Sequence, residues 1–78
     1  MYLAVKDVKP LNDYNLLLKF ENNEERVFDV KPYLNIGKFQ ELKDEKLFKS
    51  VKICFDSIEW ENQLDLDPEI LYEKSIKA

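Results

Sequence analysis

The sequence predicts an α+β domain with a mostly antiparallel sheet, in the order β-β-β-(short helices)-β-β-α. Apolar side chains alternate with period two in two separate parts of the chain, and helix signals are confined to the middle and to the last residues. The length of 78 residues suits one small domain, so we expect residues 1–78 to fold as a unit. An apolar content of 45% with 36% charged residues is typical of a globular chain.

The first strand is expected at residues 3–9. Val5 and Val8 are three residues apart, which breaks strict alternation, and a bulge between them would return both to one face. Pro10 then ends the strand or marks it as an edge, because proline has no backbone N–H to donate. Residues 11–13 are expected to form a turn.

Two further strands should form a hairpin, since apolar side chains alternate at Tyr14, Leu16, Leu18 and Phe20 and again at Phe28 and Val30, in phase with Arg26. A three-residue loop at residues 21–23 would oppose Leu16 to Phe28, whereas a two-residue loop would oppose Leu16 to Asp29 and waste the apolar face. We therefore expect the longer loop. It needs one residue in the left-handed region, and Asn23 is the tolerable choice.

The segment 31–50 is expected to be helical or irregular. Pro32 suits the first position of a short helical turn, and Gly37 suits the end of that turn. Asp44 can cap a second short helix that carries Phe48.

A second hairpin is expected around a two-residue loop at Asp56-Ser57. This loop would oppose Phe55 to Ile58 and Ile53 to Trp60, so that all four apolar side chains share one face. The alternation of Ile58 with Trp60 favours a core position for the tryptophan over an exposed anchor.

The last element should be a helix that runs towards Ile76. Asp67 is a suitable N-cap, Pro68 a suitable first helical residue, and Glu69 a carboxylate placed favourably at the positive end of the helix dipole.

Charge is distributed unevenly along the chain. The net charge is −4, but residues 53–73 contain seven acidic residues and no Lys or Arg. Such a surface repels phosphate, so we expect no direct binding of nucleic acid and instead a basic protein partner. The candidate partner-binding residues are Glu59, Glu61, Asp65 and Glu69. The simpler alternative is that these carboxylates form a solvated surface.

The composition argues against an enzyme. The chain has no histidine, so Ser–His and Cys–His nucleophile pairs are excluded, and a single glycine cannot build a phosphate-binding loop. Cys54 is the lone cysteine and would need a nearby base or cation to react. The acidic residues match no EF-hand spacing. We expect no catalytic residues, no metal and no cofactor.

The N-terminal residues show no basic region followed by an apolar run, and no apolar stretch approaches the roughly 20 residues that span a bilayer. A cytoplasmic protein without membrane contact is therefore expected. A chain this short buries limited surface, and a bound partner or a homodimer would add to its stability.

Segments along nearly the whole chain resemble the small bacterial family called domain of unknown function 2442; they are residues 8–10, 14–20, 28–34, 37–42, 48, 58–60 and 66–72. The most specific match is Trp60 followed by the Asp67-Pro68-Glu69 helix start. Family members usually carry Gly in the first hairpin and Pro-x-Gly after the Trp, where this chain has Asn23, Glu61 and Gln63. The resemblance implies an α+β domain of unsettled function that partners a second small family, in an arrangement similar to a toxin–antitoxin pair.

The leading hypothesis is therefore a small non-enzymatic protein-interaction module, an antitoxin-like partner of a basic toxin-like protein. One alternative is a DNA-associated transcriptional regulator that acts through a partner or as a dimer. Another is a small-ligand binder, which would need a pocket with converging polar groups.

Overall fold

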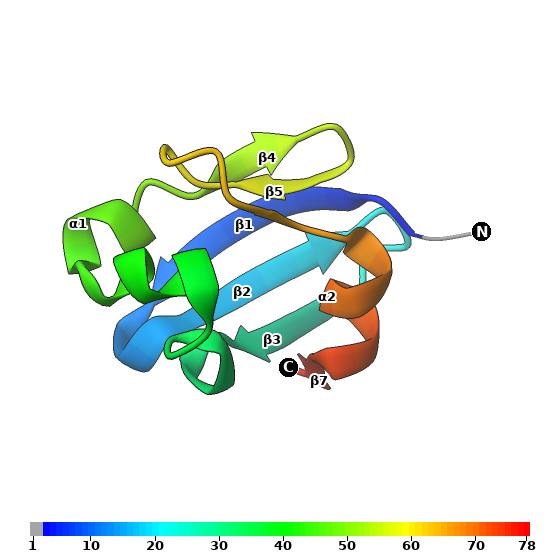
Figure 1. The fold of residues 1–78 in the computed structure, drawn as a ribbon. Helices are drawn as coiled ribbons and strands as arrows, with labels where there is room; N and C mark the ends of the chain where they lie inside the picture. The colour runs from blue at the N-terminus through cyan, green and yellow to red at the C-terminus, as the bar shows by residue number, and fades with distance from the viewer. Residues whose placement is uncertain (1–2) are drawn as a thin grey trace.

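The strands of this α+β chain form two antiparallel sheets, where the sequence suggested one (Figure 1). The structure is a computed structural model that describes residues 3–78. The four-stranded sheet has the order β1-β2-β3-β7 and the three-stranded sheet the order β4-β5-β6. The strands are β1 (Val5–Leu11), β2 (Asn15–Phe20), β3 (Glu25–Asp29), β4 (Lys52–Cys54), β5 (Ser57–Glu59), β6 (Asp65–Leu66) and β7 (Ile76–Lys77).

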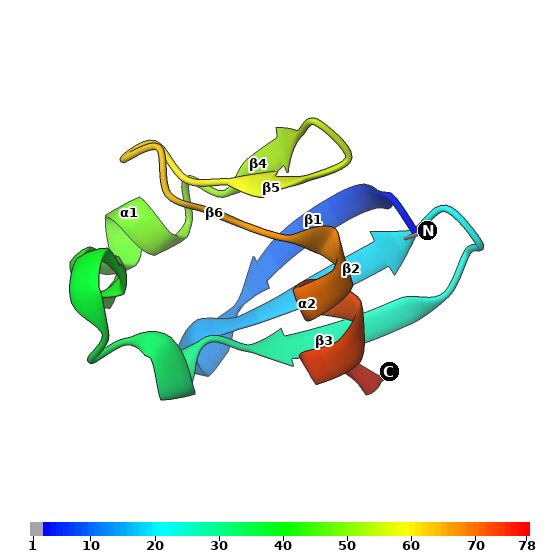
Figure 2. The ribbon, with the colours of Figure 1, turned by 45° about the vertical axis from the view of Figure 1, so that its right-hand side comes forward.

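The helices are short, and most lie between the two hairpins, as expected. They are the 3-10 helices η1 (Asn12–Tyr14), η2 (Lys31–Tyr33) and η3 (Gly37–Lys43), and the α-helices α1 (Glu45–Phe48) and α2 (Pro68–Lys74). In two views related by a 45° turn, α2 lies across β2 and β3 while α1 lies at the other end of the molecule (Figure 2).

The first strand contains the expected bulge, because the β1–β2 register shifts between Val5 and Asp7. The strand starts later than predicted and continues through Pro10 to Leu11. Proline is tolerated here because β1 is an edge strand of its sheet.

The first hairpin has the predicted register, with Leu16 opposite Phe28. Its three-residue loop is closed by a 2.9 Å bond from the Phe20 N–H to the Glu24 carbonyl. Asn23 is in the left-handed region, at φ 69°. The hairpin has a three-residue loop because only this loop length keeps the alternating apolar residues of both strands on one face.

In the middle segment, two of three predictions are confirmed. Pro32 lies in the first turn of η2, and the Asp44 carboxylate accepts a 3.0 Å bond from the Lys46 N–H at the start of α1. The prediction for Gly37 was wrong. It begins η3 at φ +48° instead of ending the preceding turn, so its conformational freedom serves a helix start.

The predicted loop of the second hairpin was wrong by one residue, so the predicted register was wrong by two residues. Ile53 lies opposite Ile58, and the two-residue loop is Phe55-Asp56. Both loop residues have positive φ, as a type I′ turn requires. The sequence argument assumed that Phe55 belongs to the apolar face, whereas the turn takes it out of the strand.

The C-terminal helix is confirmed but ends earlier than predicted. The Asp67 carboxylate caps it through a 2.8 Å bond from the Glu69 N–H. The helix stops at Lys74, and Ile76 pairs with Val27 as part of β7. The backbone at the next residue, Ser75, is extended, and a side chain of β3 binds this residue, as described below.

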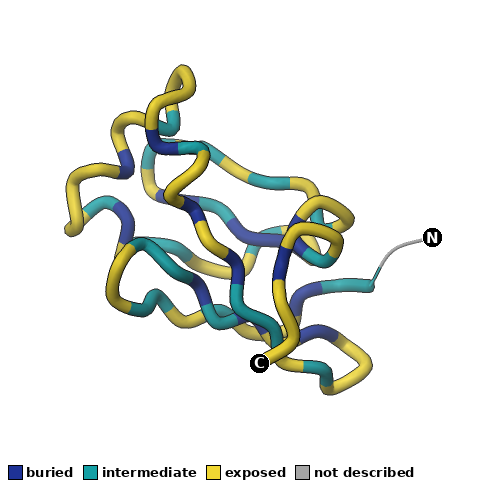
Figure 3. Tube along the Cα trace, turned by 90° about the horizontal axis from the view of Figure 1, so that it is seen from below, coloured by how far each residue is buried: buried dark blue, intermediate teal, exposed yellow. Residues whose placement is uncertain are grey.

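The core lies between the inner face of the four-stranded sheet and the elements that cover it; it comprises Val5, Leu16, Leu18, Phe20, Phe28, Val30, Leu34, Leu42, Phe48, Ile58, Trp60 and Leu71 (Figure 3). Trp60 is in the core, as predicted. Its indole N–H donates a 2.9 Å bond to the Phe48 carbonyl. One side chain therefore joins α1 to the segment that follows β5.

The loop after Trp60 has the same geometry as the loop of the first hairpin. The Trp60 N–H binds the Leu64 carbonyl at 2.9 Å, and the Gln63 N–H binds the Trp60 carbonyl at 2.9 Å. The Asn62 side chain accepts a 3.1 Å bond from the Leu64 N–H. Gln63 is left-handed at φ 68°, so a long side chain stands where a glycine would be unstrained.

We expect Gln63→Gly to stabilise the chain by about 1 kcal/mol, because it relieves this left-handed strain. The matched control is Gln40→Gly in η3, where φ is not positive and glycine should destabilise by about 0.5–1 kcal/mol. Urea unfolding of both variants measures the difference. A destabilised Gln63→Gly variant would show that the loop relies on the glutamine side chain.

Candidate functional site

A groove with a volume of about 410 Å³ lies beside the second hairpin. It runs between the β4–β5 hairpin and the chain that passes through β6 into α2. We call it the hairpin groove; its lining residues are Cys54, Phe55, Ser57, Ile58, Glu59, Asp65, Leu66, Asp67 and Pro68. Three carboxylates and one exposed aromatic ring therefore surround a single hollow.

The hairpin tip is held in place by backbone and hydroxyl hydrogen bonds. The Asp56 carbonyl accepts a 2.9 Å bond from the Val5 N–H, which fastens the turn to the start of β1. The buried Ser57 hydroxyl donates to the Leu66 carbonyl and joins β5 to β6. The groove is thus built on fixed elements, although its tip is a surface turn.

Phe55 is the most unusual residue of the groove. Its side chain is 96% exposed, and its backbone is left-handed at φ 48°. A bulky residue in this region is a genuine outlier. Ile53, nearby on β4, is also exposed, at 40%. The hairpin therefore presents apolar surface to solvent at its tip and edge.

Two of the acidic residues, Glu59 and Asp65, lie in one row of the second sheet. Strand pairing places Lys52 opposite Glu59, and Glu59 opposite Asp65. Two like charges directly opposite each other on neighbouring strands destabilise a sheet. The row therefore contains two like charges, Glu59 and Asp65, and one cation, Lys52.

Two of the four candidate residues meet in the groove and two do not. Glu59 is half-buried and Asp65 is exposed, and both line the hollow. Glu61 is exposed in the loop after Trp60, and Glu69 is exposed in the first turn of α2. Neither Glu61 nor Glu69 lines the groove.

Sequence reasoning missed Phe55 as a site residue. The signal for it was the two-residue loop itself, because moving the loop by one residue takes Phe55 from the core face to the tip. Asp67 was identified only as a helix cap. It performs that function and also lines the groove.

The thiol of Cys54 is not activated. Burial raises its pKa above the ordinary value of 9.0, and the neighbouring Glu59 carboxylate raises it further. The thiol therefore stays protonated at neutral pH, the form that is a poor nucleophile and metal ligand.

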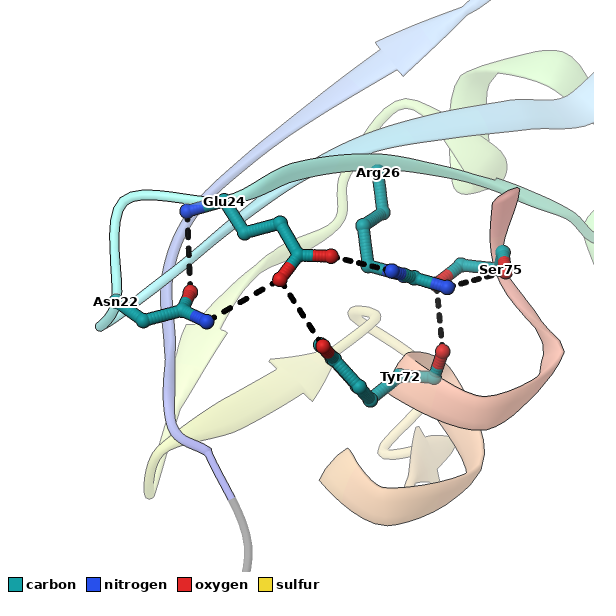
Figure 4. A network of polar contacts seen from close by, with 5 residues as sticks. All are labelled: Asn22, Glu24, Arg26, Tyr72 and Ser75. Carbon is teal, nitrogen blue, oxygen red and sulfur yellow. Dashed lines mark hydrogen bonds and ion pairs between the residues drawn. The ribbon is translucent and has the colours of Figure 1, made fainter. Parts of the chain in front are cut away.

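The wall of the groove formed by α2 is held by a polar network at the other end of that helix (Figure 4). Arg26 of β3 donates to the Ser75 hydroxyl at 2.7 Å and to the Ser75 carbonyl at 2.9 Å, and it forms an ion pair with Glu24. The Tyr72 hydroxyl donates to the Glu24 carboxylate at 3.0 Å. The Asn22 amide donates to the same carboxylate at 3.2 Å.

This network fixes the position of α2 by charge as well as by packing. The Arg26 guanidinium lies 4.4 Å from the centre of the Tyr72 ring, a cation–π distance. The Tyr72 ring also contacts Phe20 edge to face, with centroids 5.1 Å apart. Because the side chains of Glu24 and Arg26 are only 17% and 16% exposed, solvent screens their ion pair less than a surface pair.

A second hollow of about 380 Å³ lies between η1 and α1; it is lined by Leu11, Asn12, Asp13, Tyr14, Glu45, Phe48 and Lys49. Its charges are of both signs. The Tyr14 hydroxyl is already bound to the Lys43 carbonyl at 2.5 Å. This hollow offers neither the uniform charge nor the exposed aromatic ring of the hairpin groove.

Comparison with known protein families settles the classification. The family model described as protein of unknown function (DUF2442) matches residues 5–77. The chain belongs to the DUF2442 family. No curated protein and no solved structure matches the chain. The DUF2442 membership thus agrees with the resemblance seen in the sequence and assigns no activity.

The described part of the DUF2442 chain was also searched for metal-binding groups and for membrane-spanning helices. Within residues 3–78, no group of three or more His, Cys, Asp or Glu side chains is placed to hold a metal ion. Across the same residues, no helix is long and apolar enough to span a membrane.

The pKa of Glu24 is lowered below its ordinary value of 4.5, first by its bond to Arg26 and then by its bond to Tyr72. A lowered pKa contributes stability above the ordinary value, and this stability is lost as the pH falls through the folded-state pKa. We expect Glu24→Gln to be less stable than the parent chain at neutral pH, with the difference shrinking at about pH 3.

Urea midpoints at both pH values test this expectation for the DUF2442 fold. Glu73→Gln is the matched control, because Glu73 is an exposed carboxylate on α2 whose removal should leave the midpoint nearly unchanged. Equal midpoints for Glu24→Gln and the parent chain at neutral pH would contradict a stabilising role for the network.

Proposed function

We propose that this chain is a small protein-interaction module that binds a cationic segment of another protein in the hairpin groove. The observation that carries the proposal is Phe55, a 96% exposed aromatic side chain at φ 48°, beside the carboxylates of the groove. Exposed aromatic anchors next to charged groups are typical of interaction surfaces.

The argument begins with the cost of Phe55 to the isolated fold. A left-handed backbone costs a non-glycine residue about 1–2 kcal/mol. Leaving a phenylalanine in water forgoes roughly 1.5–3 kcal/mol of burial. Asn or Gly would suit this turn position better. Phe55 therefore destabilises the isolated fold. Its presence is best explained by a contact that forms only when a partner is bound.

The charges around Phe55 indicate the chemistry of that partner. Glu59 and Asp65 oppose each other across the strands, and Asp67 lines the same hollow. A Lys or Arg side chain placed between the first two would replace their repulsion with attraction. Acidic surfaces of this kind also steer a basic partner during association.

Interaction is proposed over catalysis because of the state of the two groove side chains that carry a nucleophilic atom. The Ser57 hydroxyl is buried and donates to the Leu66 carbonyl, and the raised pKa of Cys54 keeps its thiol protonated. The acidic groove also repels phosphate, so any role at DNA would run through the bound partner.

A basic toxin-like protein is the specific partner that we propose, with this chain as its antitoxin-like counterpart in the cytoplasm. The family resemblance supplies this candidate, and the acidity of the groove supports it. The interaction would combine burial of the Phe55 ring with charge pairing at Glu59 and Asp65.

The test is a tagged pull-down from the native cell, followed by mass spectrometry and reconstitution with the purified partner. The parent chain should retain one basic protein that salt releases. Phe55→Ser should weaken reconstituted binding about tenfold or more, mainly through faster dissociation. The triple variant Glu59→Lys, Glu61→Lys, Asp65→Lys should slow association and flatten its salt dependence.

Glu73→Lys is the charge control, because it reverses an exposed acid of α2 outside the groove. It should leave binding nearly unchanged. Binding that survives both Phe55→Ser and the triple reversal would refute the groove as the interaction site. A partner with an acidic surface would refute the proposed chemistry.

A further inference from the structure

The four-stranded sheet has a second face that the core does not use. Residues directly opposite each other in a sheet share a face, as do residues two apart along a strand. The register therefore assigns three rows to this outer face: Leu11–Asn15–Asp29, Lys9–Leu17–Val27–Ile76 and Asp7–Lys19–Glu25.

The apolar side chains that form the core lie on the other face of this sheet, and Leu17 and Val27 on the outer face are partly exposed. The side chains that η2, η3, α1 and α2 contribute to the core pack against the other face, where Leu16, Leu18 and Phe28 lie. Leu17, Val27 and Ile76 are absent from that core, and Ile76 is 74% exposed. Figure 2 shows α2 crossing the sheet on the covered side.

We propose that the outer face is a homodimer interface, packed against the same face of a second copy. The two-fold axis would lie in the interface and run along the strands, between β2 and β3. An isologous contact of this kind requires a surface that complements itself. The register of the sheet provides that complementarity between the two central strands, β2 and β3.

Rotation about this axis exchanges the positions of β2 and β3. Lys19 then faces Glu25 of the second copy, Leu17 faces Val27, and Asn15 faces Asp29, because these residues are already opposite each other within one chain. The axis creates each contact twice. Opposite charges meet, the apolar residues meet, and an amide donor meets a carboxylate.

Charge balance favours a second copy over a strongly charged partner. The outer face carries Lys9 and Lys19 against Asp7, Glu25 and Asp29, and the last of these already pairs with Lys31 at 3.1 Å. The excess acid of the chain lies in residues 53–73, outside these rows. Two copies can therefore approach through this face with little net repulsion. The apolar row is short, so we expect a weak, concentration-dependent dimer.

The test is sedimentation velocity of the full chain over a concentration series. The parent chain should associate as its concentration rises. Lys19→Glu and Glu25→Lys should each raise the dimer dissociation constant about tenfold or more, because each sets like charges against each other in both copies of the contact.

Mixing the two variants separates this proposal from an effect on the fold. In a mixed dimer, the two carboxylates of the Lys19→Glu chain would face the two ammonium groups of the Glu25→Lys chain, so association should return towards the parent level. The like charges within each chain remain, so a fold defect would persist. Lys38→Glu, a charge reversal in η3 away from this face, should dimerise like the parent.

Val27→Glu adds a second, independent break at the centre of the apolar row and should give a monomer that retains the circular dichroism spectrum of the parent. The proposal is overturned if the parent chain is monomeric throughout the series. It is also overturned if Val27→Glu still dimerises, or if the mixture of charge variants stays monomeric.

Discussion

The burial of Trp60 is the constraint on which the rest of the structure depends. Its indole N–H bonds to the Phe48 carbonyl at 2.9 Å, and its backbone N–H and carbonyl close the following loop. Its ring packs near that of Phe48, with centroids 6.4 Å apart. Loss of a core tryptophan typically costs about 3–5 kcal/mol, a large part of the stability of a domain of this size. Without it, the segment after β5 would lose a hydrogen bond and a ring contact to α1.

The groove departs from the consistency found elsewhere in the chain. In the core, alternation, register and hydrogen bonding all favour the same fold. At the hairpin, a left-handed Phe55 and the opposed pair Glu59 and Asp65 work against it. Such conflicts concentrate at functional sites, because binding can select residues that folding alone would not.

The two proposed surfaces divide the molecule by charge. The hairpin groove is acidic and would repel a second copy of the chain. The outer face of the four-stranded sheet is nearly balanced and complements itself. The two surfaces lie on different sheets, so a homodimer formed through the outer face would leave both grooves free. Two copies of a basic partner could then bind one dimer, and a dimeric partner would gain affinity through multivalency.

The amino-acid pattern by itself determined the elements whose cause is local. The alternation from Leu16 to Phe20 defined the first hairpin, and its match with Phe28 selected the loop length. Asp44 and Asp67 identified two helix starts, because a short acidic side chain caps the N–H groups that follow it.

Tertiary structure alone decided the features that depend on partners distant in the sequence. The turn at Phe55-Asp56 is fastened by the backbone of Val5, and its position determines which residues reach the groove. The strand at Ile76 pairs with β3 directly after Ser75, whose hydroxyl and carbonyl are bound by Arg26, 49 residues earlier in the chain. Periodicity reports how each segment meets its immediate neighbours. Periodicity cannot predict a contact with a guanidinium or a strand edge that is distant in the sequence and comes close only on folding.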